Sequence, residues 1–219
     1  FEGRMVKVPP TLFTRKKPNQ IAIDDYRIKP PYQANPVKPN DLEVAPDFVD
    51  IDCLDRFTEQ AIKWLDRQAA AARNGKPFML YLSHTSPHKP VIPLKRFRGQ
   101  GDSGAYGEFM IETDWHVGRV LDWLDENKLA DNTIVVFTSD NGPENTWRKR
   151  NEKFGHQSNG IYREGKRSIY EGGHRVPFLV RWPSKVKAGS RWEQPVCQTD
   201  LLATFAEMFG KNLSDNAGE

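Results

Sequence analysis

Three short apolar runs, separated by long helical patterns, are the feature that most constrains the fold of this chain. The runs cover residues 76–83 (KPFMLYLS), 132–140 (NTIVVFTSD) and 175–183 (RVPFLVRWP). Continuous apolar runs of this length are typical of strands that are buried on both faces of a sheet, and we expect this of residues 76–83 in particular. Because the runs alternate with helices, the sequence predicts an α/β fold with helices covering a sheet.

Two long amphipathic patterns separate these runs. Residues 50–73 place apolar side chains at helical spacing and end before Gly75, and residues 105–127 repeat the pattern. The apolar positions are Leu54, Phe57, Ala61 and Leu65 in the first helix and Ile111, Val117, Leu121 and Leu124 in the second. Asp114 falls on the apolar face of the second helix, where we expect a buried carboxylate with a structural, hydrogen-bonded role.

The later part of the chain carries weaker patterns. Residues 142–165 are polar and lack periodicity, which predicts a long loop. Residues 198–210 (QTDLLATFAEMFG) predict a short helix that is capped by Thr199 or Asp200 and ends at Gly210.

The first 48 residues hold eight of the sixteen prolines of the chain. Proline has no backbone donor and a fixed φ, which excludes a long helix or a central strand here. We expect residues 1–48 to form an irregular segment, with one short strand at 20–26, that packs on a core made by residues 49–219.

The bulk composition is that of a globular protein of one sizeable domain. The 219 residues are 37% hydrophobic and 28% charged, with a net charge of only +3, which gives no indication of a nucleic-acid or membrane partner. No apolar run approaches the length of a membrane span. Cys53 and Cys197 lie in unlike contexts, and we expect them to be unpaired thiols.

Polar side chains collect where the apolar runs end. His84 and His88 follow the first run, Asp140 and Asn141 close the second, and Lys166 lies in the segment that leads into the third. Ligands of open α/β sheets bind beyond the carboxyl ends of the strands. We therefore expect these loops to assemble one binding site.

Asp140 and Asn141 offer a carboxylate and an amide oxygen, which suit Ca²⁺ or Mg²⁺ rather than zinc. Gly142 behind them allows a tight turn. An ordinary Asp-Asn-Gly turn would have the same residues. Calcium also takes about six to eight oxygens, so that a metal site would need ligands from elsewhere.

The other two candidates are less specific when each is taken alone. His88 stands between two prolines, and a preorganised imidazole is a suitable general acid, but an ordinary surface histidine fits as well. His84 lies nearer the predicted strand and is expected to be structural. Lys166 by itself has the character of a solvated charge.

Four stretches in order resemble the type I sulfatases, the formylglycine-dependent arylsulfatase branch of the alkaline phosphatase superfamily. They are residues 77–90, 104–144, 165–183 and 198–210. The resemblance implies an alkaline-phosphatase-like three-layer α/β sandwich with a mostly parallel or mixed central sheet, present here in part. It also implies a sulfuric-ester hydrolase.

The resemblance implies a role for each matched residue. Asp140 and Asn141 correspond to two ligands of the active-site Ca²⁺, for which Mg²⁺ is a possible substitute. His88 corresponds to the histidine that contacts the sulfate ester near its leaving oxygen, and Lys166 to the lysine that binds a sulfate oxygen. The nucleophile of the family is a formylglycine, made from a cysteine or serine by the formylglycine-generating enzyme.

The chain departs from the family at the nucleophile. Neither Cys53 nor Cys197 is followed by the x-Pro-Ser-Arg of the maturation motif, and the early strand with paired aspartates, the Lys-x-His pair and the small C-terminal subdomain are not found. Asp24 and Asp25, in the stretch Ile-Asp-Asp at 23–25, lie in the proline-rich segment, and we reject them as a substitute for the paired aspartates of the family. We therefore expect the formylglycine to lie outside this chain, and this chain alone to be inactive.

Two other functions stay open at this point. One is a phosphodiester or phosphonate-ester hydrolase of the same superfamily, and the other is a homologue that binds sulfated glycans without cleaving them. The expected partners are a sulfate-ester small molecule or a sulfated glycan. Export to the periplasm, the cell exterior or the lysosome follows from the family resemblance alone.

Overall fold

The computed structural model describes residues 14–16, 42–44, 49–214 and 217 of the chain. It divides into two units, residues 1–184 and 185–219, and each unit is described by itself. The short strand expected at 20–26 lies outside the described residues. The packing of residues 1–48 on the core stays a prediction, although β1 (Thr14–Lys16) and β2 (Leu42–Val44) pair there as an antiparallel ladder.

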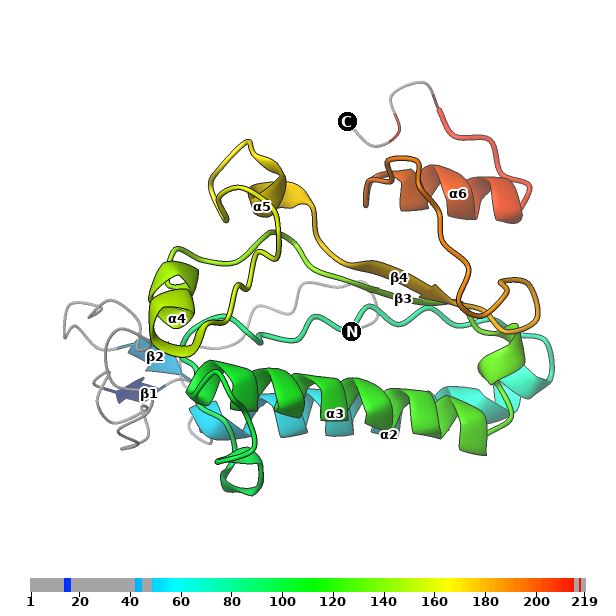
Figure 1. Cartoon of the computed structure of the whole chain (residues 1–219). Helices are drawn as coiled ribbons and strands as arrows, with labels where there is room; N and C mark the ends of the chain where they lie inside the picture. The colour runs from blue at the N-terminus through cyan, green and yellow to red at the C-terminus, as the bar shows by residue number, and fades with distance from the viewer. Residues whose placement is uncertain (1–13, 17–41, 45–48, 215–216, 218–219) are drawn as a thin grey trace. The chain divides into compact units, whose positions relative to one another are not determined.

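Two long helices form one layer of the first unit and confirm both amphipathic patterns. Helices α2 (Cys53–Arg73) and α3 (Ala105–Glu126) lie side by side (Figure 1). Short 3₁₀ helices precede or follow them at Asp50–Asp52, Lys95–Phe97 and Ala130–Asn132. Leu54, Ala61 and Leu65 are buried as expected, whereas Phe57 is 41% exposed.

A pair of strands forms the second layer, and it positions the site. Strands β3 (Val135–Thr138) and β4 (Phe178–Arg181) lie within two of the predicted apolar runs and pair antiparallel. Thr138 stands opposite Phe178, so the end of β3 lies beside the beginning of β4. Segments that follow β3 and precede β4 are therefore brought to the same edge.

The first apolar run behaves differently from the prediction of a strand buried on both faces. Residues 76–83 pair with no strand among the described residues, and Met79 and Tyr81 are 75% and 85% exposed. Phe78 and Leu80 face the opposite way and pack against the helices. The run is buried on one face because α2 and α3 cover only that side.

Two hydrophobic clusters hold the helices and the β layer together. One lies where the ends of the long helices meet β3, and it contains Leu65, Ala69, Trp123, Leu124, Leu129 and Ala130, with Val135 packed against it. The other lies at the beginning of both helices and contains Leu54, Val91, Ile92, Ala105 and Phe109. Both helices are therefore anchored at each end by apolar burial.

Two further sequence predictions are wrong. Asp114 is exposed, and the buried carboxylates of α3 are Glu108 and Glu112 instead, because the helix turns a slightly different face to the core. The long loop expected at 142–165 contains the helix α4 (Trp147–Phe154), which ends at Gly155 with a left-handed φ of 68°.

Two short helices complete the chain. Helix α5 (Glu171–His174) precedes β4, and α6 (Asp200–Met208) lies in the second unit with Gly210 beyond its end, as predicted. The Asp200 carboxylate accepts a hydrogen bond from the Cys197 amide (2.8 Å). Neither cysteine forms a disulfide, as expected. No helix among the described residues is long and apolar enough to cross a membrane.

Candidate active site

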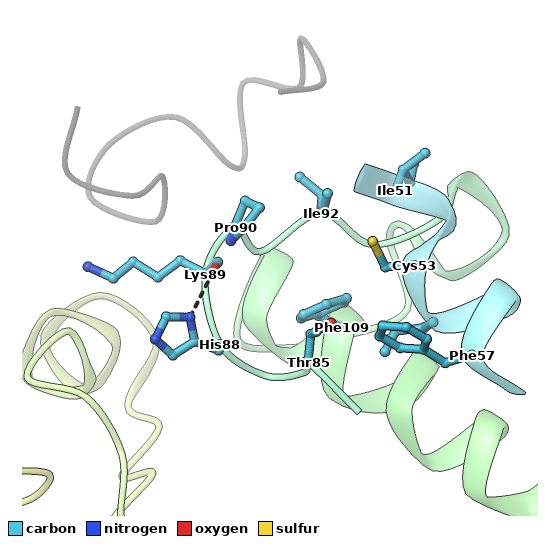
Figure 2. Close-up of a pocket in the computed structure, with 10 residues that line it drawn as sticks. Ile51, Cys53, Phe57, Thr85, His88, Lys89, Pro90, Ile92 and Phe109 are labelled. Carbon is cyan, nitrogen blue, oxygen red and sulfur yellow. Dashed lines mark hydrogen bonds between the residues drawn. The ribbon is translucent and has the colours of Figure 1, made fainter. Parts of the chain in front are cut away.

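The loop after residues 76–83 holds His88 in a fixed orientation. The His88 amide donates to the carbonyl of Thr85 (3.0 Å), and the ring nitrogen Nδ1 lies 2.8 Å from the carbonyl oxygen of Lys89 (Figure 2). A carbonyl oxygen can only accept, so Nδ1 carries a proton. Nε2 is then the nitrogen that can face a ligand, and the ring is exposed.

An apolar cavity of about 410 Å³ lies beside this histidine. Its walls come from the beginning of α2, from the 85–92 loop and from Phe109 of α3, as Figure 2 shows. His88 and Lys89 are the basic side chains among its lining residues. The cavity can therefore receive an apolar group next to an imidazole.

Asp140 and Asn141 directly follow β3, where the sequence placed them. The Asn141 side-chain nitrogen donates to the carbonyl of Gly142 (3.1 Å), which leaves its side-chain oxygen directed elsewhere. The Asp140 carboxylate is exposed and forms no hydrogen bond or ion pair with the described residues. Two hard oxygens without a protein partner fit a Ca²⁺ or Mg²⁺ ion, for which they would supply part of the ligand shell.

Other ligands for such an ion are not gathered here. Within the part of the chain that the structure describes, no three His, Cys, Asp or Glu side chains are grouped to hold a metal. Any complete site therefore needs donors beyond Asp140 and Asn141.

Gly142 is required by a close backbone approach rather than by a tight turn. Its amide donates to the carbonyl of Gly173 (2.8 Å), and a Cβ at position 142 would lie 1.8 Å from the carbonyl oxygen of Gly172. The φ of Gly142 is not in the left-handed region. The glycine therefore lets the Asp140–Asn141 turn pack directly on α5.

Lys166 is brought to the same place by its backbone. Its amide donates to the carbonyl of Pro143 (2.9 Å), three residues after Asp140. The Lys166 side chain is partly buried, and its ammonium group pairs with no described residue. The backbone bond therefore joins the segment that carries a cation to the segment that carries two oxygen donors, and these groups suit a site that binds an anion and a metal ion together.

Glu144 connects the segment that carries Asp140 and Asn141 to the segment that carries Lys166. The Arg167 guanidinium donates to its carboxylate (2.6 and 2.8 Å) and, together with the Asn145 amide and the charges of Arg167 and Lys89, holds the pKa of Glu144 at about 2. The structure thus places the backbone segment of Lys166 against the segment that carries Asp140 and Asn141, whereas a common site with His88 stays a prediction.

A buried polar cluster behind the site was missed in the sequence. His116 and Glu112 are fully buried, and His116 Nε2 lies 3.8 Å from Glu112 and 3.6 Å from Asp55. His84 lies in the same cluster, with its ring 6.0 Å from that of His116, which agrees with a structural role. Its burial, followed by the charge of His116, lowers the pKa of His84 to about 4.

Spacing could have revealed part of this cluster. Glu108, Glu112 and His116 recur at intervals of four residues, which places them on one helix face. Glu108 and Glu112 accept backbone hydrogen bonds from Gly99 (2.7 Å) and Leu94 (2.8 Å). They fix the segment that follows the His88 loop.

Comparisons with known proteins agree with this geometry. A family model described as Sulfatase matches residues 14–211. An N-acetylgalactosamine-6-O-sulfatase of Bacteroides thetaiotaomicron is 37% identical over 172 residues, which are 77% of this chain and 32% of that protein. The human steryl-sulfatase is 35% identical over 161 residues, which are 74% of this chain and 27% of that protein.

Solved structures resemble the chain in the same way. One, described under the metabolism of multiple glycosaminoglycans by Bacteroides thetaiotaomicron, superposes with a TM-score of 0.72 at 33% identity and covers 84% of this chain and 39% of its own. Another, Ps i-CgsB in complex with k-i-k-neocarrahexaose, gives a TM-score of 0.64 at 29% identity, over 82% of this chain and 38% of its own.

These likenesses confirm the alkaline-phosphatase-like α/β fold, of which the described residues show a helical layer and two antiparallel ladders. The chain spans about a third of the length of the two curated relatives. The match to the family model extends over nearly all of the chain and includes every predicted site residue. The chain belongs to the sulfatase family.

Proposed function

We propose that the protein containing this chain is a sulfuric-ester hydrolase whose site includes His88, Asp140, Asn141 and Lys166. The observation that carries the proposal is the convergence of the segments that carry Asp140, Asn141 and Lys166. Antiparallel pairing puts the end of β3 beside the beginning of β4, and the Lys166 amide bonds to the carbonyl of Pro143. This convergence occurs in a chain whose relatives are named as sulfatases.

Each side chain has a task that follows from its chemistry. Breaking the S–O bond of a sulfate ester moves negative charge onto the bridging oxygen. Lys166 would bind a sulfuryl oxygen as a fixed cation. His88, with Nδ1 donating to Lys89, would direct a protonated Nε2 at the leaving oxygen and act as the general acid.

Asp140 and Asn141 would hold a Ca²⁺ ion, with Mg²⁺ as the alternative. Such an ion supplies charge stabilisation for the sulfuryl oxygens. The nucleophile would be a formylglycine, which the formylglycine-generating enzyme makes in a part of the protein outside this chain. As in the family, the protein would act after export.

For the substrate we propose a sulfated glycan. One relative is named for N-acetylgalactosamine 6-O-sulfate, and one similar structure holds a carrageenan-type hexasaccharide. The apolar cavity beside His88 favours a second candidate, the sulfate ester of an apolar alcohol. Comparing kcat/KM for a sulfated sugar and for an aryl sulfate discriminates between them.

Replacing Lys166 by alanine in the full-length protein tests the site. Loss of one preorganised positive group at the sulfate should reduce kcat/KM by about 100-fold or more. Lys149→Ala, which removes an exposed lysine from α4, is the matched control and should leave turnover unchanged. Full activity of the Lys166→Ala protein would refute the assignment.

A further inference from the structure

We propose that Glu144 is a positioning residue for Lys166, which it acts on through Arg167. The inference rests on the proposed function, because it assigns a role to Glu144 in the same site. Glu144 follows the Asp140–Asn141 turn, and Arg167 is the neighbour of Lys166 in the chain. Their ion pair therefore joins the segment that carries the metal ligands to the segment that carries the lysine.

Both carboxylate oxygens of Glu144 are hydrogen-bonded in the Glu144–Arg167 pair. Both oxygens of the Glu144 carboxylate accept from Nη1 of Arg167, and one of them also accepts from the backbone amide of Asn145 (2.9 Å). The Glu144 side chain is only 25% exposed, although that of Arg167 is 64% exposed. The carboxylate is thus held by a second hydrogen bond from its own segment and can serve as an anchor for the more exposed Arg167.

The backbone beside Lys166 needs such an anchor. Arg167 has a φ of 75°, in the left-handed region that residues with a Cβ rarely adopt, and Glu164 has a φ of 64°. Such conformations persist where the surroundings impose them. The Glu144–Arg167 pair and the bond from the Lys166 amide to Pro143 hold this segment on both sides of the Lys166 side chain.

The Glu144 carboxylate stays ionised at neutral pH. The hydrogen bond from Arg167 is the main cause that lowers its pKa to about 2, and the charge of Lys89 contributes less. A change at Glu144 should alter the placement of the lysine without touching the substrate.

Stability alone does not explain this arrangement. Exposed ion pairs contribute little to the free energy of unfolding. Arg181 and Asp125 form a comparable pair (2.8 Å), but at the opposite end of β4 from the site. This second pair provides a matched control for the loss of one surface ion pair.

The experiment measures kcat, KM and thermal unfolding of the full-length enzyme with Glu144→Gln, Arg167→Gln and Asp125→Asn. Misplacing a reacting group by about 1 Å costs on the order of 100-fold, and a loosened loop should cost about tenfold in kcat/KM. We expect this loss for both Glu144→Gln and Arg167→Gln, with unchanged unfolding temperatures, and no loss for Asp125→Asn.

A double-mutant cycle separates positioning from an independent effect. If Glu144 acts through Lys166, adding Glu144→Gln to the Lys166→Ala enzyme should reduce its residual turnover by less than about twofold. Losses that multiply, or a Glu144→Gln enzyme with wild-type kcat/KM, would overturn the inference while the Lys166 assignment stands. A fully active Lys166→Ala enzyme would instead overturn the proposed site itself.

Discussion

His84, which is largely buried between the long helices, should make the stability of the folded protein sensitive to moderate acid. His84 lies between α2 and α3, with Nε2 3.3 Å from the Thr58 hydroxyl and its ring beside that of His116. The carboxylates of Asp55 in α2 and Glu112 in α3 lie 3.6 and 3.8 Å from Nε2 of His116. Burial, with the charge of His116, lowers the pKa of His84 from 6.5 to about 4.

The sign of the effect follows from proton binding. Between pH 6.5 and pH 4 the unfolded chain protonates His84, whereas the folded protein keeps the ring neutral. The unfolded state binds more protons in this window, so the folded protein loses stability as the pH falls through it. Between pH 7 and pH 5 these two pKa values give a loss of about 2 kcal/mol. Because part of the ring reaches solvent, we expect about 1 to 2 kcal/mol.

Urea unfolding, followed by tryptophan fluorescence at pH 7 and pH 5, measures this loss. The His84→Gln protein should lose about 1 to 2 kcal/mol less than the wild type between the two pH values. His174→Gln, which changes an exposed histidine, should follow the wild type. Equal pH dependence of the wild type and the His84→Gln protein would refute the reasoning, because no other histidine was changed.

Three further outcomes follow from the structure. Gly142→Ala should destabilise the protein by about 3 kcal/mol in calorimetry, because its Cβ would meet the Gly172 carbonyl, while Gly118→Ala, with nothing within 4 Å, should not. Glu112→Ala should cost about 2 kcal/mol in urea unfolding, because the amide of Leu94 loses its acceptor (2.8 Å), and an unchanged midpoint would contradict this. Removing divalent cations with a chelator should abolish sulfate-ester hydrolysis, and added Ca²⁺ should restore it; activity that survives chelation would contradict a metal-dependent site.

Local sequence signals were sufficient for most of the elements that frame the site. The periodicity of 50–73 and 105–127 placed α2 and α3 within three residues, and two apolar runs contain β3 and β4. The motif order indicated the sulfatase family, which the family model confirms. The individual roles of His88, Asp140, Asn141 and Lys166 stay predictions.

Other features escaped because their signals are weak or non-local. Helix α4 has a polar sequence without an apolar face, so hydrophobic periodicity does not predict it. Gly155, which ends the helix, is equally typical of a loop. The face of α3 was assigned from apolar residues alone, which placed Asp114 in the core in place of Glu112. The run 76–83 is apolar at positions on both faces, so its sequence does not show that α2 and α3 cover only one of them.

The sequence by itself determined where α2, α3, β3 and β4 form, which family the chain belongs to and which polar residues follow the apolar runs. Those properties depend on side chains that are close together in the chain. Only the tertiary structure decided that the end of β3 lies beside the beginning of β4. It also decided that position 142 has no room for a Cβ and that Glu144 forms an ion pair with Arg167. These contacts connect residues that are 23 to 40 positions apart in the chain, and only the packing of the folded backbone brings such partners together.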